Sequence, residues 1–274
     1  MISKQDFIPT ISNLKICPKC KGTGWIVKEH QNERTKMLYG DIFVDYAFPC
    51  PCCNGGHDKN VIEAKENADI PNVFYNARLK DFDFNFYKDE QGNTKDLSAI
   101  HKAIDSFVND FDKWSERGYG FYFYSGLKGT GKTFLASCIC NELMNKYAIK
   151  TKYVSYCNLI ALSKAGKEYG SIYDRNPIQL LCDCPVLVID DLGAIKSNEW
   201  IDGIMFRIVD TRMNNKKITI YTSNKKLQEH QMNDDRIIDR INATTIQFAF
   251  PEYSVRCRNA IEAKRDFLNQ IGVK

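Results

Sequence analysis

The chain has 274 residues, 43% of them hydrophobic, which is enough to bury the core of one large domain or of two unequal ones. Its formal net charge of +4 permits a nucleic-acid partner without requiring one, because basic side chains favour such binding only where they cluster. The first residues lack the apolar core of a signal peptide and no apolar run reaches the length of a membrane span, which excludes a membrane partner and predicts a cytoplasmic protein.

Cysteine is unevenly distributed along the chain. Five of the 11 cysteines fall between positions 17 and 53, and the rest lie in apolar segments farther on. In a cytoplasmic chain, cysteines favour metal binding or buried thiols over disulfides. We expect the scattered six to be small core residues: Cys138, Cys140, Cys157, Cys182, Cys184 and Cys257.

Two early segments share the pattern C-P-x-C-x-G, residues 17–22 and residues 50–55. A C-x-x-C turn aims two thiolates at one metal, and two such turns supply the four ligands of a structural Zn²⁺. The predicted ligands are Cys17, Cys20, Cys50 and Cys53, with Cys52 as the alternative to Cys53 and with His30 and His57 as possible substitutes. Alternating residues over 41–46 suit a hairpin arm, so we expect a zinc ribbon.

The expected zinc-binding domain covers residues 1–60 and has too little apolar content to fold without its metal. A polar, helix-compatible stretch follows and ends at Ile70-Pro71, so residues 61–80 are the expected linker. The larger domain is expected over residues 81–274. Its first long helix is predicted over 98–114, because apolar residues recur there at helical spacing after a capping Ser98.

Residues 126–133 read G-L-K-G-T-G-K-T and follow the strand-like stretch 120–125. In a G-x-x-x-x-G-K-[ST] loop, glycines let backbone N–H groups surround phosphate oxygens, the lysine brings positive charge and the hydroxyl binds Mg²⁺. No base-reading motif of the G proteins is visible, which favours ATP. The predicted ATP-binding residues of the loop are Gly126, Gly129, Thr130, Gly131, Lys132 and Thr133.

A second motif lies farther along the chain, where four apolar residues are followed by Asp190 and Asp191. A buried parallel strand that ends in carboxylates places them at the ligand-binding edge of an α/β sheet. Asp190 is expected to hold Mg²⁺ and Asp191 to polarise the attacking water, unless the pair is only a solvated turn. Asn224, after a later strand, either orients that water or caps the next helix.

Helix-like and strand-like segments alternate after the phosphate loop. Helices are predicted over 132–147, from 158 and over 200–213, and strands over 152–156, 186–189 and 217–222. Such alternation specifies a parallel sheet covered by helices, so the expected fold class is α/β.

Four arginines have informative positions near the end of the chain. Arg236 and Arg240 are four residues apart and share one helix face. In a side-by-side assembly, one of them can reach a neighbour's terminal phosphate; otherwise both pair locally with aspartates. Arg256 and Arg258 begin the last helix, and either can fold back onto the nucleotide.

These elements together resemble the AAA+ ATPases of the DnaC/DnaI helicase-loader group and the related IstB transposition ATPases. The resemblance extends from about residue 69 to the C-terminus. It rests on the phosphate loop, V-L-V-I-D-D-L-G ending at Gly193, T-S-N ending at Asn224, the Asp239-Arg240 pair and S-V-R ending at Arg256. It implies an AAA+ P-loop NTPase, here preceded by a small zinc-ribbon-like domain.

The same resemblance implies a role for each matching residue. Asp190 corresponds to the Mg²⁺-associated acid, Asp191 to the catalytic acid and Asn224 to sensor one. Arg240 corresponds to the arginine finger, with Arg236 in reserve, and Arg256 to sensor two. The resemblance implies ATP hydrolysis that is slow and dependent on self-association through the ATP site.

By this resemblance the chain is a loader that binds a hexameric replicative DNA helicase and delivers it onto single-stranded DNA. The alternative is an IstB-like transposition regulator on duplex DNA, and a third hypothesis is a zinc-dependent binding protein whose nucleotide site is structural. Candidate contacts to single-stranded DNA are Lys164, Lys167 and Tyr169, because basic and aromatic side chains together suit such binding. The alternative is that these residues form an ordinary solvated helix face.

Overall fold

The computed structural model describes residues 25–30, 44–49, 56–88, 91–159, 161–162 and 176–271. Its contacts divide the chain into two compact units, Met1–Ile62 and Glu63–Lys274. The five early cysteines and the candidate DNA contacts Lys164, Lys167 and Tyr169 lie outside the described residues. No helix in the described ranges is long and apolar enough to cross a membrane.

The described part of the first unit is built on an antiparallel hairpin. Strand β1 (Trp25–His30) pairs with β2 (Val44–Pro49), so that Trp25 faces Pro49 at one end and His30 faces Val44 at the other. An antiparallel pair is what the alternating residues of this stretch predict. Helix α2 (Gly56–Glu66) spans the boundary between the units.

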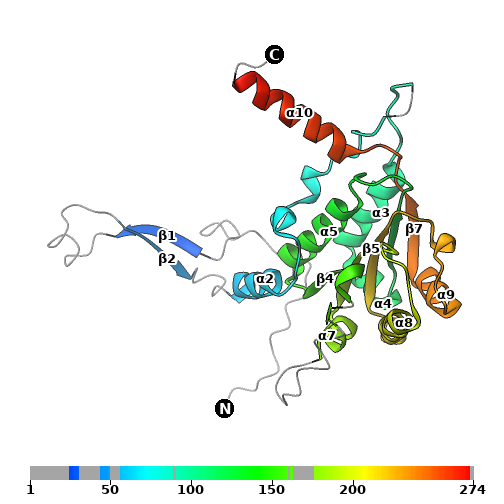
Figure 1. Cartoon of the computed structure of the whole chain (residues 1–274). Helices are drawn as coiled ribbons and strands as arrows, with labels where there is room; N and C mark the ends of the chain where they lie inside the picture. The colour runs from blue at the N-terminus through cyan, green and yellow to red at the C-terminus, as the bar shows by residue number, and fades with distance from the viewer. Residues whose placement is uncertain are drawn as a thin grey trace, which may run out of the picture. The chain divides into compact units, whose positions relative to one another are not determined.

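The second unit contains a five-stranded sheet with the order β4-β5-β6-β3-β7. Every neighbouring pair in it is parallel, which confirms the predicted α/β class (Figure 1). The strands are β3 (Gly120–Tyr124), β4 (Thr151–Ser155), β5 (Val186–Leu192), β6 (Ile218–Ser223) and β7 (Thr245–Ala249). Strands β4 and β7 form the two edges of the sheet.

Helices cover both faces of this sheet. The described helices are α3 (Ser98–Asn109), α4 (Phe111–Arg117), α5 (Lys132–Tyr147), α7 (Pro177–Asp183), α8 (Glu199–Asn214), α9 (Asp235–Thr244) and α10 (Val255–Gln270). Short 3₁₀ turns are η2 (Asn72–Phe74), η3 (Leu79–Asp81) and η4 (Leu227–Glu229). Helices α3, α4 and α5 pack on one face, and α7, α8 and α9 on the other.

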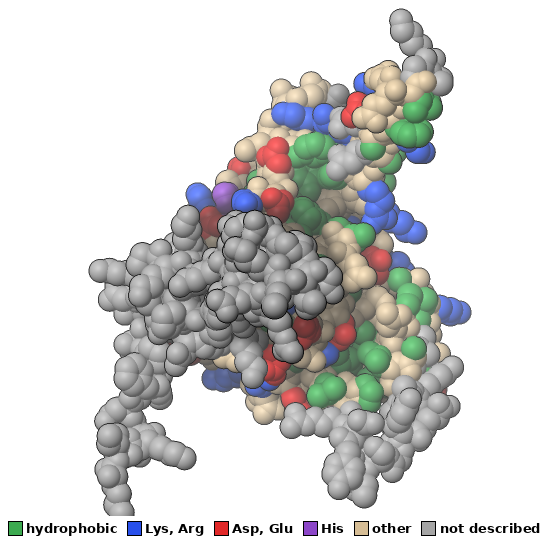
Figure 2. All heavy atoms as spheres, turned by 90° about the vertical axis from the view of Figure 1, so that its left-hand side faces the viewer, with side chains coloured by type: hydrophobic (Ala, Val, Ile, Leu, Met, Phe, Trp, Pro, Cys, Tyr) green, Lys and Arg blue, Asp and Glu red, His purple; other side chains and the backbone are tan. Residues whose placement is uncertain are grey.

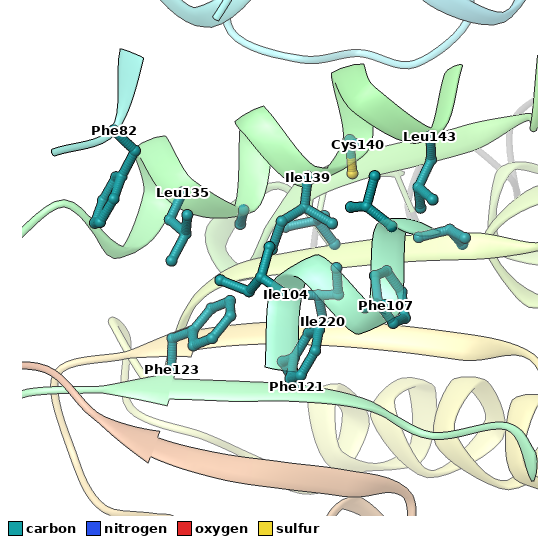
Figure 3. Close-up of a cluster of buried hydrophobic side chains, with 14 of the residues drawn as sticks. Phe82, Ile104, Phe107, Phe121, Phe123, Leu135, Ile139, Cys140, Leu143 and Ile220 are labelled. Carbon is teal, nitrogen blue, oxygen red and sulfur yellow. The ribbon is translucent and has the colours of Figure 1, made fainter. Parts of the chain in front are cut away.

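Side chains alternate along the central strands β5, β6 and β3 between two apolar cores, as the period of a strand requires. On β3, Phe121 and Phe123 point into the core under α3 and α5, whereas Tyr122 belongs to the opposite core. Figure 3 shows Ile104 and Phe107 of α3 between this sheet face and the apolar side of α5. This packing fixes α5, and therefore its N-terminal phosphate loop, on the sheet.

The sequence and the structure agree closely in the middle of the chain. Helix α5 has the predicted bounds, and β4, β6 and α8 lie within one residue of theirs. The helix predicted over 98–114 is present but interrupted, because Asp110 leaves the helical region at φ −118° and ψ 41° and separates α3 from α4. Ser98 is not the cap that was predicted: the N-cap is Leu97, and the Ser98 N–H donates to Asp96 Oδ1 at 2.8 Å.

The scattered cysteines fall into two groups. Cys138, Cys140, Cys182 and Cys184 are buried, as predicted. The prediction was wrong for Cys157 and Cys257, which are exposed. Cys157 follows the edge strand β4, and Cys257 lies in the first turn of α10, whose described side chains are mostly exposed.

The first residues of the second unit contribute to its core and contact the edge of its sheet. Ala64, Ala68 and Ile70 are buried in the core under α3 and α5. Ala68 O accepts the N–H of Tyr153 on β4 at 2.7 Å. This segment therefore extends hydrogen bonding along the outer edge of β4.

Candidate nucleotide-binding site

The loop between β3 and α5 has a backbone that requires glycine at two positions. Gly129 and Gly131 lie in the left-handed region, at φ 77° and 93°. A Cβ on Gly131 would approach the Tyr87 hydroxyl to 2.8 Å, and one on Gly129 would approach Ser254 Oγ to 2.9 Å. The loop is thus held tightly between two segments that are distant in sequence.

Tyr87 anchors the loop from the side of the preceding segment. Its hydroxyl donates a 2.7 Å hydrogen bond to the carbonyl of Thr130. The ring is buried among Phe82, Phe86 and Phe250, and burial raises the pKa of the phenol. Tyr87 therefore stays a neutral donor and fixes the loop carbonyl.

Lys132 is the cation of the loop and is only 5% exposed. Its ammonium donates to Leu127 O at 3.2 Å, Thr130 Oγ1 at 3.1 Å and Asn224 Oδ1 at 3.1 Å. Burial lowers the pKa of Lys132 to about 8; the charges of Asp191 and Asp190 oppose this shift, and that of Arg256 adds to it. A negatively charged phosphate would reverse the shift, because it favours the protonated lysine.

Asp190 lies at the end of β5, is 6% exposed, and is surrounded by hydroxyl donors. Its Oδ1 accepts from Thr133 Oγ1 at 2.8 Å and from Thr222 Oγ1 at 2.5 Å. Its Oδ2 accepts from the Tyr153 hydroxyl at 2.5 Å. Hydroxyl donors from α5, β6 and β4 thus fix the Asp190 carboxylate next to Thr133.

The adjacent Asp191 adopts a left-handed backbone, with φ 53°. Its N–H donates to Thr222 Oγ1 at 2.9 Å, so Thr222 fixes both acidic residues. Burial, and then the charge of Asp190, raise the pKa of Asp191, whereas Lys132 and Arg256 lower it. A carboxylate whose pKa is raised is a stronger base for a water proton.

The end of β6 joins these groups to the phosphate loop. Ser223 Oγ donates to Leu192 O at 2.8 Å and lies 3.1 Å from His230 Nε2. Asn224 contacts Lys132, and the turn η4 that follows is preceded by Lys226 and has no side-chain cap. The structure therefore does not support a capping role for Asn224.

Arg256 lies beside the loop, because its N–H donates to Gly129 O at 3.2 Å and its charge acts on Lys132 and Asp191. Arg258, the other candidate, turns away: its guanidinium lies 4.7 Å from the centroid of the Phe86 ring and donates to Tyr253 OH at 3.1 Å. Of the two residues, Arg256 is therefore the one that lies beside the phosphate loop.

Arg236 and Arg240 occupy one face of α9. Arg236 pairs with Asp234, and Arg240 pairs with Asp210 of α8, each at 2.8 Å. Both guanidinium groups lie over the ring of Phe206, at 4.4 and 4.7 Å from its centroid. Among the described residues, the hydrogen-bond partners of both arginines belong to α8 and to α9 with its N-cap, not to the phosphate loop.

The oxygen ligands at the loop fit Mg²⁺. The Thr133 hydroxyl and the Asp190 carboxylate lie 2.8 Å apart, and Mg²⁺ is usually held by one or two protein oxygens together with phosphates and water. No cluster of three or more His, Cys, Asp or Glu occurs among the described residues. Thr133 and Asp190 thus offer two of the oxygens that a Mg²⁺ bound together with phosphates would need.

Residues 59–263 match the family described as "IstB-like ATP binding protein". The chain belongs to this family. Among IstB-like relatives, the replicative helicase loader DnaC of Escherichia coli (strain K12) is 29% identical over 167 residues, which cover 58% of this chain and 64% of DnaC. The replicative helicase loader DnaI of Bacillus subtilis (strain 168) is 27% identical over 128 residues, or 46% of this chain and 39% of DnaI.

This IstB-like chain thus spans less than two thirds of the length of these curated relatives. A crystal structure of DnaI superposes on it with a TM-score of 0.53 and 24% identity, and covers 71% of this chain and 100% of that one. This likeness confirms the predicted fold, a parallel sheet covered by helices.

Sequence reasoning missed the residues that support the site. Tyr87, Tyr153 and His230 carry no recognisable motif, because their hydroxyl and imidazole groups meet the site only through tertiary contacts. Thr222 and Ser223 stand next to Asn224 in the T-S-N segment, and their position at a strand end was the available signal.

Proposed function

We propose that this protein is an ATP-controlled loader that binds a hexameric replicative DNA helicase and delivers it onto single-stranded DNA. The observation that carries the proposal is the assembled site of Lys132, Asp190, Asp191 and Asn224. Support for the partner comes from the relatives named as replicative helicase loaders. The proposed cofactors are ATP, Mg²⁺ and Zn²⁺.

ATP hydrolysis at this site would be slow in the isolated chain. Lys132 supplies charge to the terminal phosphates, Asp191 accepts a proton from the attacking water, and Asn224 orients that water. When bound, Mg²⁺ would supply further neutralisation of phosphate charge, held by Thr133 and Asp190. The charge that develops on the transferred group would be stabilised by an arginine of a neighbouring copy, so activity depends on self-association.

The contact between Lys132 and Asn224 suggests how ATP acts as a switch. The ammonium has three donors, and the structure pairs them with three protein acceptors. A phosphate oxygen that binds Lys132 must displace one of them. If ATP displaces Asn224, the end of β6 differs between the ATP-bound and the ATP-free protein. A partner that prefers one of these two states is then bound or released as ATP binds.

We also propose that residues 1–60 form a zinc-binding domain, separate from the ATPase domain over 81–274. The described hairpin supports this, since its register pairs Trp25 with Pro49, the hairpin residues nearest in sequence to Cys20 and Cys50. In a zinc ribbon, two C-x-x-C turns meet through such a pairing. The proposed ligands remain Cys17, Cys20, Cys50 and either Cys53 or Cys52.

The proposed contacts to single-stranded DNA are Lys164, Lys167 and Tyr169. A basic, aromatic segment suits binding without sequence preference. Figure 2 shows acidic and basic side chains interspersed on the described part of one face, rather than a continuous basic stripe. DNA binding by a localised segment is consistent with such a surface.

Native mass spectrometry of the protein with the replicative helicase of its host tests the function. With ATP and Mg²⁺ we expect a helicase hexamer that carries several copies of the chain, each with one zinc. The Lys132→Ala variant should lose the ATP dependence of this complex. No complex, together with ATP-driven oligomers on duplex DNA, would instead support the IstB-like transposition regulator.

Paired cysteine variants test the zinc site separately. Cys53→Ser should lose zinc and Cys52→Ser should retain it, because Cys53 has the same C-x-x-C spacing as Cys17 and Cys20. The reverse result would exchange the fourth ligand. Stoichiometric zinc in a variant that lacks both Cys17 and Cys20 would overturn the proposed site.

A further inference from the structure

Tyr153 has an unusual position for a residue of an edge strand. It lies on β4 and is only 8% exposed, and its hydroxyl reaches Asp190 Oδ2 on the neighbouring strand at 2.5 Å. The register pairs Tyr153 with Val188, and Asp190 follows two residues later on the same face of the sheet. The phenol therefore extends forward along that face to the carboxylate.

The side chain of Tyr153 is largely shielded from water, so its hydroxyl donates to Asp190 with little competition from solvent. The backbone of Tyr153 is itself fixed, because its N–H donates to Ala68 O at 2.7 Å. Beside it, Lys152 Nζ lies 2.7 Å from Asp69 Oδ2. The segment that docks on the edge of β4 thus holds the strand that carries the phenol.

The two oxygens of Asp190 have different partners. Oδ1 accepts from Thr133 and Thr222, whereas Tyr153 is the donor that the structure gives to Oδ2 among the described residues. Hydrogen bonds to Oδ1 alone hold that one atom and let the rest of the carboxylate swing about it, and a donor on the second oxygen removes that freedom. The rotation matters here because Asp190 must present its oxygens in a fixed direction to a cation.

We propose that Tyr153 is a positioning residue that fixes the rotation of Asp190 for Mg²⁺-dependent nucleotide binding. This inference rests on the proposed ATP site but not on any helicase or DNA partner. A competing explanation is that Tyr153 only fills space, since its ring belongs to the core under α5. The two roles use different parts of the side chain, the hydroxyl for positioning and the ring for packing.

Three variants separate these roles. Tyr153→Phe removes only the hydroxyl, and Tyr153→Leu removes the ring as well. Tyr156→Phe is the matched control, because Tyr156 is also buried and its hydroxyl contacts Ser197 rather than Asp190. The measurements are the affinity for a fluorescent ATP analogue in EDTA and across a Mg²⁺ titration, together with the melting temperature of each variant.

For Tyr153→Phe we expect unchanged affinity in EDTA and a Mg²⁺ midpoint that is raised about tenfold, which is the scale for one hydrogen bond to a charged group. Tyr156→Phe should match the wild type in both. If Tyr153→Phe has the wild-type Mg²⁺ midpoint, or a lower one, the inference is overturned; if only Tyr153→Leu is impaired, packing is the role. A wild-type protein that fails to bind the analogue at all would refute the ATP site itself, which is a distinct result.

Discussion

Lys132 Nζ lies 3.1 Å from Asn224 Oδ1, so the cation of the phosphate loop and the amide at the end of β6 are directly hydrogen-bonded. The two residues are 92 positions apart in sequence, and each was predicted separately as part of a nucleotide site. Their contact means that a ligand of Lys132 also acts on the end of β6. Thr222 of this strand is hydrogen-bonded to Asp190 and Asp191 on β5.

The first prediction concerns the charge of the loop. Lys132→Ala should reduce ATP affinity at least about a hundredfold, because it removes a buried charged donor to the phosphates. The fold should remain, since the lysine is not part of an apolar core. Fluorescent ATP titration and thermal unfolding measure the two effects.

Lys146→Ala is the control for this change, because Lys146 lies at the other end of α5 and contacts Asn109 instead of the loop. It should bind ATP as the wild type does. Unchanged ATP affinity in Lys132→Ala would contradict the assignment of the phosphate loop.

The lowered pKa of Lys132 predicts proton uptake on ATP binding. The pKa is about 8 against an ordinary 10.5, so above pH 8 the lysine is largely neutral and a phosphate must recharge it. ATP affinity should therefore fall as the pH rises through 8. Calorimetry at pH 8.5 in buffers of different ionisation enthalpy should show uptake of about three quarters of a proton.

The stability of the fold should change with pH in the opposite direction to ATP affinity. Between pH 8 and 10.5 the unfolded chain holds the Lys132 proton and the folded chain has lost it, so the free energy of unfolding without ATP should rise with pH across this window. Lys132→Arg keeps its proton at these pH values and should lose both effects. ATP binding without proton uptake near pH 8.5 would contradict this prediction.

Much of the site was predictable because its chemistry depends on local spacing. The loop 126–133 and the Asp190-Asp191 pair are read from a few adjacent residues whose roles follow from backbone geometry. The supporting contacts were not predictable in this way, since Tyr87 and Tyr153 meet the site from segments 43 and 37 residues away. Strand β7 was also missed, because its residues are only partly buried at an edge and give a weak apolar signal.

The buried His230 predicts acid destabilisation. Tyr122 OH donates to Lys225 O and Ser223 Oγ donates to Leu192 O, so both oxygens are free to accept the Nε2–H of a neutral His230, at 2.9 and 3.1 Å. Burial, with a smaller effect of the Lys225 charge, lowers the pKa of His230 to about 4 from 6.5.

The unfolded chain therefore binds a proton at His230 before the folded chain does, and the free energy of unfolding should fall as the pH drops from 6.5 towards 4. Urea unfolding at several pH values in this window measures the slope. His230→Gln should make the slope shallower by about one proton. His101→Gln on the surface of α3 is the control, and an equal change in both variants would contradict a special role for His230.

Arg212 should be a strong determinant of stability. It is 1% exposed and donates to Leu181 O at 2.7 Å, Cys184 O at 2.8 Å and Thr219 Oγ1 at 2.8 Å, and so joins the end of α7 to the sheet. Arg212→Leu leaves these acceptors without a donor and should reduce the free energy of unfolding by about 4 kcal/mol. Arg207→Leu, an exposed change on the same helix, should cost less than about 0.5 kcal/mol in the same urea titration.

The last prediction distinguishes Arg240 from Arg236 as the arginine that acts on a neighbouring copy. Arg240 has a side chain that is 24% exposed and paired with Asp210, whereas Arg236 is 67% exposed and paired with Asp234 of its own helix cap. The pairing with α8 holds Arg240 at a fixed place on the surface, as a residue that must meet a phosphate across an interface requires. Arg240→Ala should therefore lose at least about a hundredfold of assembly-dependent ATP hydrolysis and keep ATP affinity, while Arg236→Ala should retain most of its activity.

A mixing experiment shows whether the arginine acts across an interface. Arg240→Ala copies have an intact nucleotide site without the arginine, and Asp191→Asn copies have the arginine without the catalytic acid. In a mixed assembly, some interfaces place the intact site of an Arg240→Ala copy against the arginine of an Asp191→Asn copy. Steady-state hydrolysis should therefore recover in the mixture, although each variant alone is inactive. If instead Arg236→Ala is inactive alone and recovers in this mixture, while Arg240→Ala stays active alone, the role belongs to Arg236. No recovery with either variant would mean that the Arg240–Asp210 pair only supports the packing of α9 on α8, and that hydrolysis does not depend on an arginine from a neighbour.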